Sequence, residues 1–120
     1  EQLYEELSPV LAPPVLDRFR IIMQKCSERG CWFQGHAASV NLMFNKTGLF
    51  TFYNSGDLYL SYKDKSILKR EDLTDALQKL RELFPDYNEN GERLGKINDF
   101  VGYEEEILDV IEGVIEILER

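Results

Sequence analysis

The feature that most constrains the fold is a change of hydrophobic period at Ala37. From Val40 onward apolar residues recur at every second position, which places them on one side of an extended chain. The pattern runs through two tight turns, at residues 45–48 and 54–56, where Gly48 and Gly56 are expected in left-handed conformations. The apolar side comprises Val40, Leu42, Phe44, Phe50, Phe52, Leu58, Leu60 and Tyr62. The pattern predicts a three-stranded antiparallel meander with one apolar face.

Three segments outside the meander carry apolar residues at helical spacing. The first begins at Pro13, is expected to end at Gly30 and includes Cys26 on its apolar face. The second is leucine-rich and stops before Pro85, and the third begins at about Tyr103; residues 86–98 between them predict a long polar loop. A one-sided sheet must be covered. We therefore predict an α+β fold with an N-terminal helix, a three-stranded antiparallel meander and two C-terminal helices packed on one face.

Length and composition are those of one folded domain. A chain of 120 residues can bury one core, and 43% hydrophobic residues exclude general disorder. We expect residues 1–12 to be a leader or linker from a preceding domain and residues 13–120 to form a single α+β domain. No apolar run approaches the ~20 residues that span a bilayer, so no membrane partner is expected. Two cysteines are too few for a secreted disulfide framework, which favours a cytoplasmic location.

The acidity of the chain is concentrated at its C-terminal end. The formal net charge is −8, and residues 99–120 contribute eight acids and one base to it. The outer face of the last predicted helix is therefore acidic and is either a solvated surface or a docking surface for a basic partner.

Residues 26–36 (CSERGCWFQGH) contain both cysteines, the only tryptophan and the only histidine. The spacing of Cys26, Cys31 and His36 does not match that of a standard zinc knuckle, and Cys26 lies on an apolar helix face. We expect no metal site and no cofactor, and we interpret Trp32 and Phe33 as packing residues at a helix-to-strand corner. The remaining site hypothesis for this stretch is a redox pair of Cys26 and Cys31.

Catalytic patterns are absent from the sequence. A Cys31–His36 pair has no recognisable orienting residue. A nuclease-like acid-x-lysine pattern fails because Ser61 stands two residues before Lys63. Residues 91–97 do not complete a phosphate-binding loop. We predict that the chain is not an enzyme.

Basic residues cluster after the third predicted strand, close to tyrosines of the meander. The cluster comprises Lys63, Lys65, Lys69 and Arg70. Cations beside exposed rings such as Tyr53, Tyr59 and Tyr62 can hold a single nucleic-acid strand by charge and stacking. The alternative is that solvated lysines protect the edge of the sheet.

Three segments of the chain carry a resemblance to a known module. They are LFTFYNSGDLYLSY (49–62), LTDALQKLRELFP (73–85) and INDF (97–100). They resemble a small C-terminal module of larger, mostly uncharacterised bacterial proteins, some with endonuclease-like domains. The resemblance implies no catalytic residues in this part of the protein.

These observations favour a non-catalytic accessory or interaction domain of a larger bacterial protein, with a protein partner or a neighbouring domain of the same chain. The alternative is the substrate-contacting, nucleic-acid-binding part of a DNA-associated enzyme whose catalytic residues lie elsewhere. A third hypothesis is a small-molecule sensor with a pocket between helices and sheet. The sequence does not determine the oligomeric state.

Overall fold

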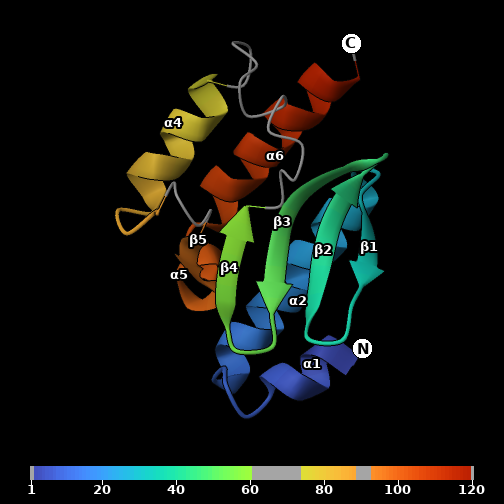
Figure 1. Ribbon diagram of the computed structural model, residues 1–120, viewed down its shortest axis with the longest axis vertical. Coiled ribbons are helices and arrows are strands. Elements are labelled where there is room, and N and C mark those ends of the chain that lie inside the picture. The colour runs from blue at the N-terminus through green and yellow to red at the C-terminus, as the bar shows by residue number, and fades with distance from the viewer. Residues whose placement is uncertain (1, 61–73, 89–92, 120) are drawn as a thin grey trace.

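The computed structural model describes residues 2–60, 74–88 and 93–119 and shows an α+β fold with a five-stranded antiparallel sheet (Figure 1). The strands are β1 (Trp32–Gly35), β2 (Ser39–Phe44), β3 (Thr47–Tyr53), β4 (Asp57–Leu60) and β5 (Arg93–Lys96). They are neighbours in chain order, β1-β2-β3-β4-β5. The helices are α1 (Gln2–Leu7), α2 (Pro13–Glu28), α4 (Thr74–Leu83), α5 (Ile97–Gly102) and α6 (Glu104–Leu118).

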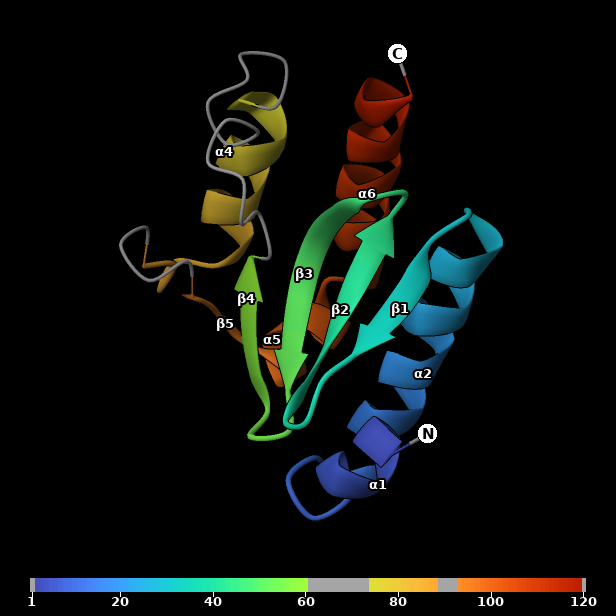
Figure 2. The same ribbon diagram turned by 45° about the vertical axis from the view of Figure 1, so that its right-hand side comes forward.

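One face of the sheet is covered by helices and carries the core. Helices α2, α5 and α6 lie behind it, and no described element crosses the opposite face (Figures 1 and 2). Phe19 of α2, Phe52 of β3 and Phe100 of α5 are fully buried, and the ring of Phe52 lies 5.0 Å from Phe19 and 5.2 Å from Phe100. The predicted apolar face of the meander is thus the face that the helices cover. None of the described helices is long and apolar enough to cross a lipid bilayer.

Helix α2 confirms the predicted first helix and its end at Gly30. Its buried residues are Phe19, Ile22, Met23 and Cys26. Gly30 has a φ of 94°, and its N–H donates to the carbonyl oxygen of Ser27, while the N–H of Cys31 donates to that of Cys26. These two bonds form a Schellman motif, which satisfies the last carbonyls of the helix and turns the chain directly into β1.

The predicted three-stranded meander is present as β2, β3 and β4, but the sheet is larger than predicted because two further strands flank it. Strand β1 pairs with β2 and strand β5 with β4. Each spans four residues, and neither WFQG nor RLGK alternates clearly between apolar and polar side chains. Backbone pairing with a neighbour defines such strands, and a periodicity of side chains does not reveal it. The predicted loop 86–98 therefore contains β5 and the start of α5.

The two meander turns differ in how they match the prediction. Gly56 has the expected left-handed conformation, with a φ of 90°. At the first turn the left-handed residue is Asn45, with a φ of 53°, so the prediction for Gly48 is wrong. Phe44 pairs with Thr47, so the loop consists of only two residues, and the left-handed conformation falls on the first of them, Asn45. Gly48 lies within β3 opposite Met43, next to a register shift.

Residues 2–12 contribute to the core of the domain. Leu7, at the end of α1, is fully buried and Leu11 is 3% exposed, and both belong to the main hydrophobic cluster. The segment that the sequence suggested as a leader or linker therefore packs against the domain, and α1 lies across the beginning of α2 (Figure 2).

Candidate functional site

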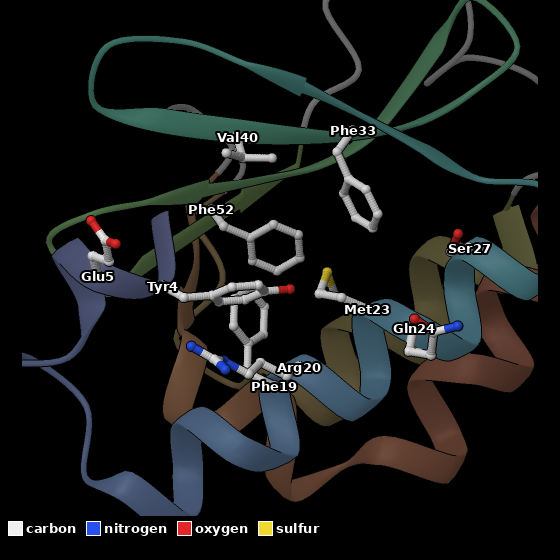
Figure 3. Close-up of a pocket in the computed structure, with 10 residues that line it drawn as sticks. All are labelled: Tyr4, Glu5, Phe19, Arg20, Met23, Gln24, Ser27, Phe33, Val40 and Phe52. Atoms are coloured by element: carbon white, nitrogen blue, oxygen red, sulfur yellow. The ribbon is translucent and has the colours of Figure 1, made fainter. Parts of the chain in front are cut away.

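A groove of about 610 Å³ opens between α1, α2 and the first three strands (Figure 3). It is lined by Tyr4, Glu5, Phe19, Arg20, Met23, Gln24, Ser27, Phe33, Val40 and Phe52. This volume lies within the range of small-molecule and peptide-side-chain pockets. The groove is therefore the candidate binding site of the chain.

The floor of the groove is apolar and belongs to the core. Phe19 and Phe52 are fully buried and Met23 is 4% exposed. Phe33 stands directly opposite Leu42 in the sheet, so the two side chains share the helix-covered face. Leu42 is fully buried, whereas Phe33 remains 40% exposed. The helices thus leave the β1 end of this face partly uncovered, and the ring of Phe33 projects from β1 toward α2 (Figure 3).

The rim is polar and includes a stacked cation. The guanidinium carbon of Arg20 lies 4.6 Å from the centre of the Tyr4 ring, and the Tyr4 ring packs edge-on to Phe19 at 5.9 Å. Burial raises the pKa of the Tyr4 hydroxyl, and the positive charge of Arg20 opposes that rise. Within residues 2–60, 74–88 and 93–119, no carboxylate forms an ion pair with Arg20. Glu5, Gln24 and Ser27 complete the rim with exposed polar groups.

The Cys26–Cys31 pair is brought together by the cap of α2. Both thiols are free, Cys26 is fully buried and Cys31 is 6% exposed. Burial, with a smaller contribution from the neighbouring Cys31 thiol, raises the pKa of Cys26 to about 12, and the positive charge of Arg29 opposes that rise. Burial also raises the pKa of Cys31. The thiolate is the reactive form, so this environment disfavours reaction with oxidants, and the redox role stays a prediction.

His36, which the sequence places near the two cysteines, contacts Asn41 in the structure. Its Nε2 is 3.3 Å from Nδ2 of Asn41, whose Oδ1 accepts a hydrogen bond of 2.7 Å from Thr51. Asn41 and Thr51 are the buried polar residues of the described chain. No group of three or more His, Cys, Asp or Glu residues with the geometry to hold a metal ion occurs there.

The predicted nucleic-acid residues Lys63, Lys65, Lys69 and Arg70 lie outside the described residues, as does Tyr62. Tyr53 and Tyr59 are described and half-buried, and their rings meet edge to face at 5.1 Å. Tyr59 stands opposite Thr51 on the face of the sheet that no described element covers. The structure thus places two of the three predicted tyrosines together.

Part of the acidic face of α6 is used inside the domain. Nζ of Lys25 lies 2.9 Å from the carboxylate of Glu104, and Arg29 donates a hydrogen bond to Glu112. Lys25 belongs to α2 and Arg29 is the C-cap residue that follows it, so these two pairs connect the C-terminal end of α2 with α6. The acidic helix therefore has a basic partner surface within its own chain.

Sequence reasoning missed most of the groove. Tyr4 was assigned to a leader, and Phe33 was interpreted as a corner residue that packs, although the structure leaves it 40% exposed. The sequence carried no clear signal for Phe33, because it lies seven positions before Val40 and so falls outside the two-residue period of the meander. Assembling the groove also requires the position of α1, which no local pattern encodes.

Comparisons of the chain with models of protein families, with curated proteins and with solved structures returned no significant match. The resemblance to a bacterial C-terminal module therefore stays a prediction.

Proposed function

We propose that the chain is a non-catalytic interaction domain of a larger bacterial protein and that the groove between α1, α2 and the sheet is its binding site. The observation that carries this proposal is the ring of Phe33, 40% exposed above the fully buried Phe19 and Phe52. An apolar side chain on the covered face of a sheet is normally buried by the opposing layer. Here the layer is incomplete, and a ligand in the groove would complete it.

The chemistry of the groove supports binding. Its floor offers aromatic and thioether contacts, and its rim offers one cation, one carboxylate and several hydrogen-bonding groups. Pockets with an apolar body and few polar groups typically orient a ligand by those polar groups. The ligand class that fits is therefore amphipathic.

A tryptophan placed at the rim tests whether the groove is the binding site. Ser27 lies on the rim of α2, and its exposed neighbour Glu28 lies outside the groove. Nitrogen-15-labelled protein is titrated with randomised heptapeptides and with aliphatic and aromatic carboxylates. We expect amide shifts to cluster around the groove, to disappear in Ser27→Trp and to persist in Glu28→Trp. Shifts elsewhere, or shifts unaffected by Ser27→Trp, would contradict the proposal.

Nucleic-acid contact is the second candidate, favoured by the paired rings of Tyr53 and Tyr59 on the face of the sheet that no described element covers. Aromatic rings beside cations can stack on unpaired bases. A labelled oligothymidine is titrated at low salt against the wild type and against a variant with Lys63, Lys65, Lys69 and Arg70 changed to alanine. This candidate requires binding by the wild type that the variant loses, and equal binding or none by both excludes it.

A further inference from the structure

We propose that the groove takes an extended peptide from a partner protein, which adds to the edge of β1 as a sixth strand. This inference depends on the proposed function, because it names the occupant of the same groove. Strand addition joins main-chain hydrogen bonds at a sheet edge to side-chain pockets beside it. Both parts are present here, since β1 is the terminal strand of the described sheet and Phe33 of β1 lines the groove.

The backbone of β1 has hydrogen-bonding groups directed away from β2. The N–H of His36 donates to the carbonyl oxygen of Ser39 at 2.8 Å, which fixes the phase of the β1–β2 ladder. Bonded and non-bonded pairs alternate along an antiparallel ladder. Gln34, two residues before His36, therefore bonds to β2 at Asn41. Phe33 and Gly35 fall in the non-bonded positions, so their N–H and C=O groups point to the outer edge.

The β3 side of β2 supports the same phase. The N–H of Asn54 donates to the carbonyl oxygen of Ala38 at 2.9 Å, which makes Ala38 and, two residues on, Val40 the bonded positions toward β3. Val40 pairs with Phe52 across that ladder and with Gly35 across the other. Since Val40 bonds to β3, its pair with Gly35 is a non-bonded one. The outward direction of the Gly35 amide thus follows from two independent hydrogen bonds.

The edge also lacks the features that normally prevent strand addition. Natural edge strands carry lysine, proline or inward-pointing charges. The sequence of β1 is Trp-Phe-Gln-Gly, without charge or proline, and all four residues are exposed. An ideal Cβ built on Gly35 meets no heavy atom within 4 Å. Space for a partner side chain therefore exists beside Gly35, on the face that Phe33 and Val40 share.

Charge and side-chain direction define the partner. Alternate residues of an added strand face the same side of the sheet as Phe33, whose ring lines the groove together with Met23, so those positions are apolar. Arg20 lies in the part of the groove beside Tyr4 and has no ion-pair partner among the described residues (Figure 3). The partner peptide therefore carries an acidic residue next to its apolar positions, where it meets the Arg20 guanidinium.

Proline at Gly35 tests strand addition directly. Gly35→Pro removes the outward-pointing N–H at this position. Proline is tolerated in an edge strand at such a position, so the substitution is compatible with the fold. Gly35→Ala is the matched control, since open space surrounds its Cβ. Peptides are selected from a displayed library of random dodecapeptides on the full chain, and the affinities of the selected synthetic peptides are measured. We expect Gly35→Pro to weaken binding by about tenfold or more and Gly35→Ala by less than about twofold.

Amide hydrogen exchange gives a readout that does not depend on a variant. In the complex the amides of Phe33 and Gly35 should gain protection, whereas that of Gln34, already bonded to β2, should change little. Arg20→Gln should weaken the binding of acidic peptides and reduce its salt dependence.

The outcomes separate this inference from the proposed function. One outcome would overturn strand addition and retain the groove as the binding site. In that case the selected peptides bind Gly35→Pro as tightly as wild type, fail to bind Ser27→Trp and leave the amides of Phe33 and Gly35 unprotected from exchange. Peptides indifferent to Ser27→Trp would overturn both. The chain could instead form a dimer through β1, in which case its molecular mass in solution is that of two copies in wild type and of one copy in Gly35→Pro. This result would identify a second copy as the occupant and overturn the proposal of a partner peptide. Failure to select any peptide would also overturn it.

Discussion

The backbone N–H of Cys31 donates a hydrogen bond of 3.1 Å to the carbonyl oxygen of Cys26, and this bond explains why the two cysteines are neighbours. It spans the Schellman cap of α2, in which the residue after the left-handed glycine commonly makes an apolar contact with the last turn of the helix. Cys26 and Cys31 occupy those two positions and are both buried. Their proximity therefore has a structural cause that requires no shared chemistry.

Replacement of Gly30 should destabilise the domain through its backbone conformation. A φ of 94° is strained for a residue with a Cβ, although the nearest atom to that Cβ, on Phe44, is at an ordinary 3.5 Å. We expect Gly30→Ala to lower the free energy of unfolding by about 1–2 kcal/mol. Gly113→Ala in α6 is the control, because nothing lies within 4 Å of its Cβ, and it should raise stability by about 0.5–1 kcal/mol. Urea denaturation measures both changes, and equal stability of Gly30→Ala and wild type would refute the argument.

The thiols should react only when the cap opens. With a pKa of about 12, roughly one Cys26 in ten thousand is a thiolate at pH 8. We expect a thiol-specific reagent to modify native protein at least about a hundredfold more slowly than protein in urea. Gly30→Ala should increase the native rate because it weakens the cap. Rapid modification of both native cysteines, or ready formation of a Cys26–Cys31 disulfide by oxidised glutathione, would instead support the redox hypothesis.

The sequence correctly predicted the elements in which apolar side chains repeat with a helical or a strand period over several turns or several alternations. Helices α2, α4 and α6 and the strands β2, β3 and β4 have such patterns, and the structure contains them. Strands β1 and β5 are four residues long, so their existence depends on pairing with a neighbour. The Gly48 error has a similar origin, since loop length is set by the pairing of Phe44 with Thr47.

The site was harder to predict than the fold. The groove exists because α1 packs near Phe19 and because the helix layer leaves Phe33 partly uncovered, and both are properties of tertiary packing. The candidate site residues predicted from the sequence were selected for the chemistry of their side chains, thiols and cations, and not for their position in the packed domain. Of these, Cys26 and Cys31 are explained by a helix cap, and the basic cluster from Lys63 to Arg70 lies outside the described residues.

Phe100 should be among the most sensitive positions of the domain, although the sequence pattern placed it after a polar loop. Its fully buried ring lies 5.2 Å from that of Phe52 and 5.6 Å from that of Phe50. We expect Phe100→Ala to lower the free energy of unfolding by about 3–5 kcal/mol. Phe33→Ala, which removes the same ring from the open groove, should cost about 1 kcal/mol or less. Chemical denaturation of both variants checks the ranking, and a larger loss for Phe33→Ala would show that β1 belongs to the core.

The pair of Asp57 and Arg93 should make stability depend on pH in the acid range. Nη2 of Arg93 lies 2.9 Å from Oδ1 of Asp57 and joins β4 to β5, and Ser55 donates to the other carboxylate oxygen at 2.8 Å. These hydrogen bonds, that of Arg93 foremost, lower the pKa of Asp57 in the folded state. A lowered folded pKa stabilises the protein above the unfolded value of about 4, and this contribution disappears as the pH falls through the folded pKa.

Asp57→Asn should therefore be less stable than wild type at pH 7 and equally stable at low pH. Because about a third of each side chain is exposed, the expected loss at neutral pH is at most about 1 kcal/mol. The same substitution in an Arg93→Gln background should cost less, which a double-mutant cycle by urea denaturation at pH 7 and pH 3 measures. A stability difference that is the same at both pH values, or that persists fully without Arg93, would show that the charge of Asp57 does not contribute to holding β5 on the sheet.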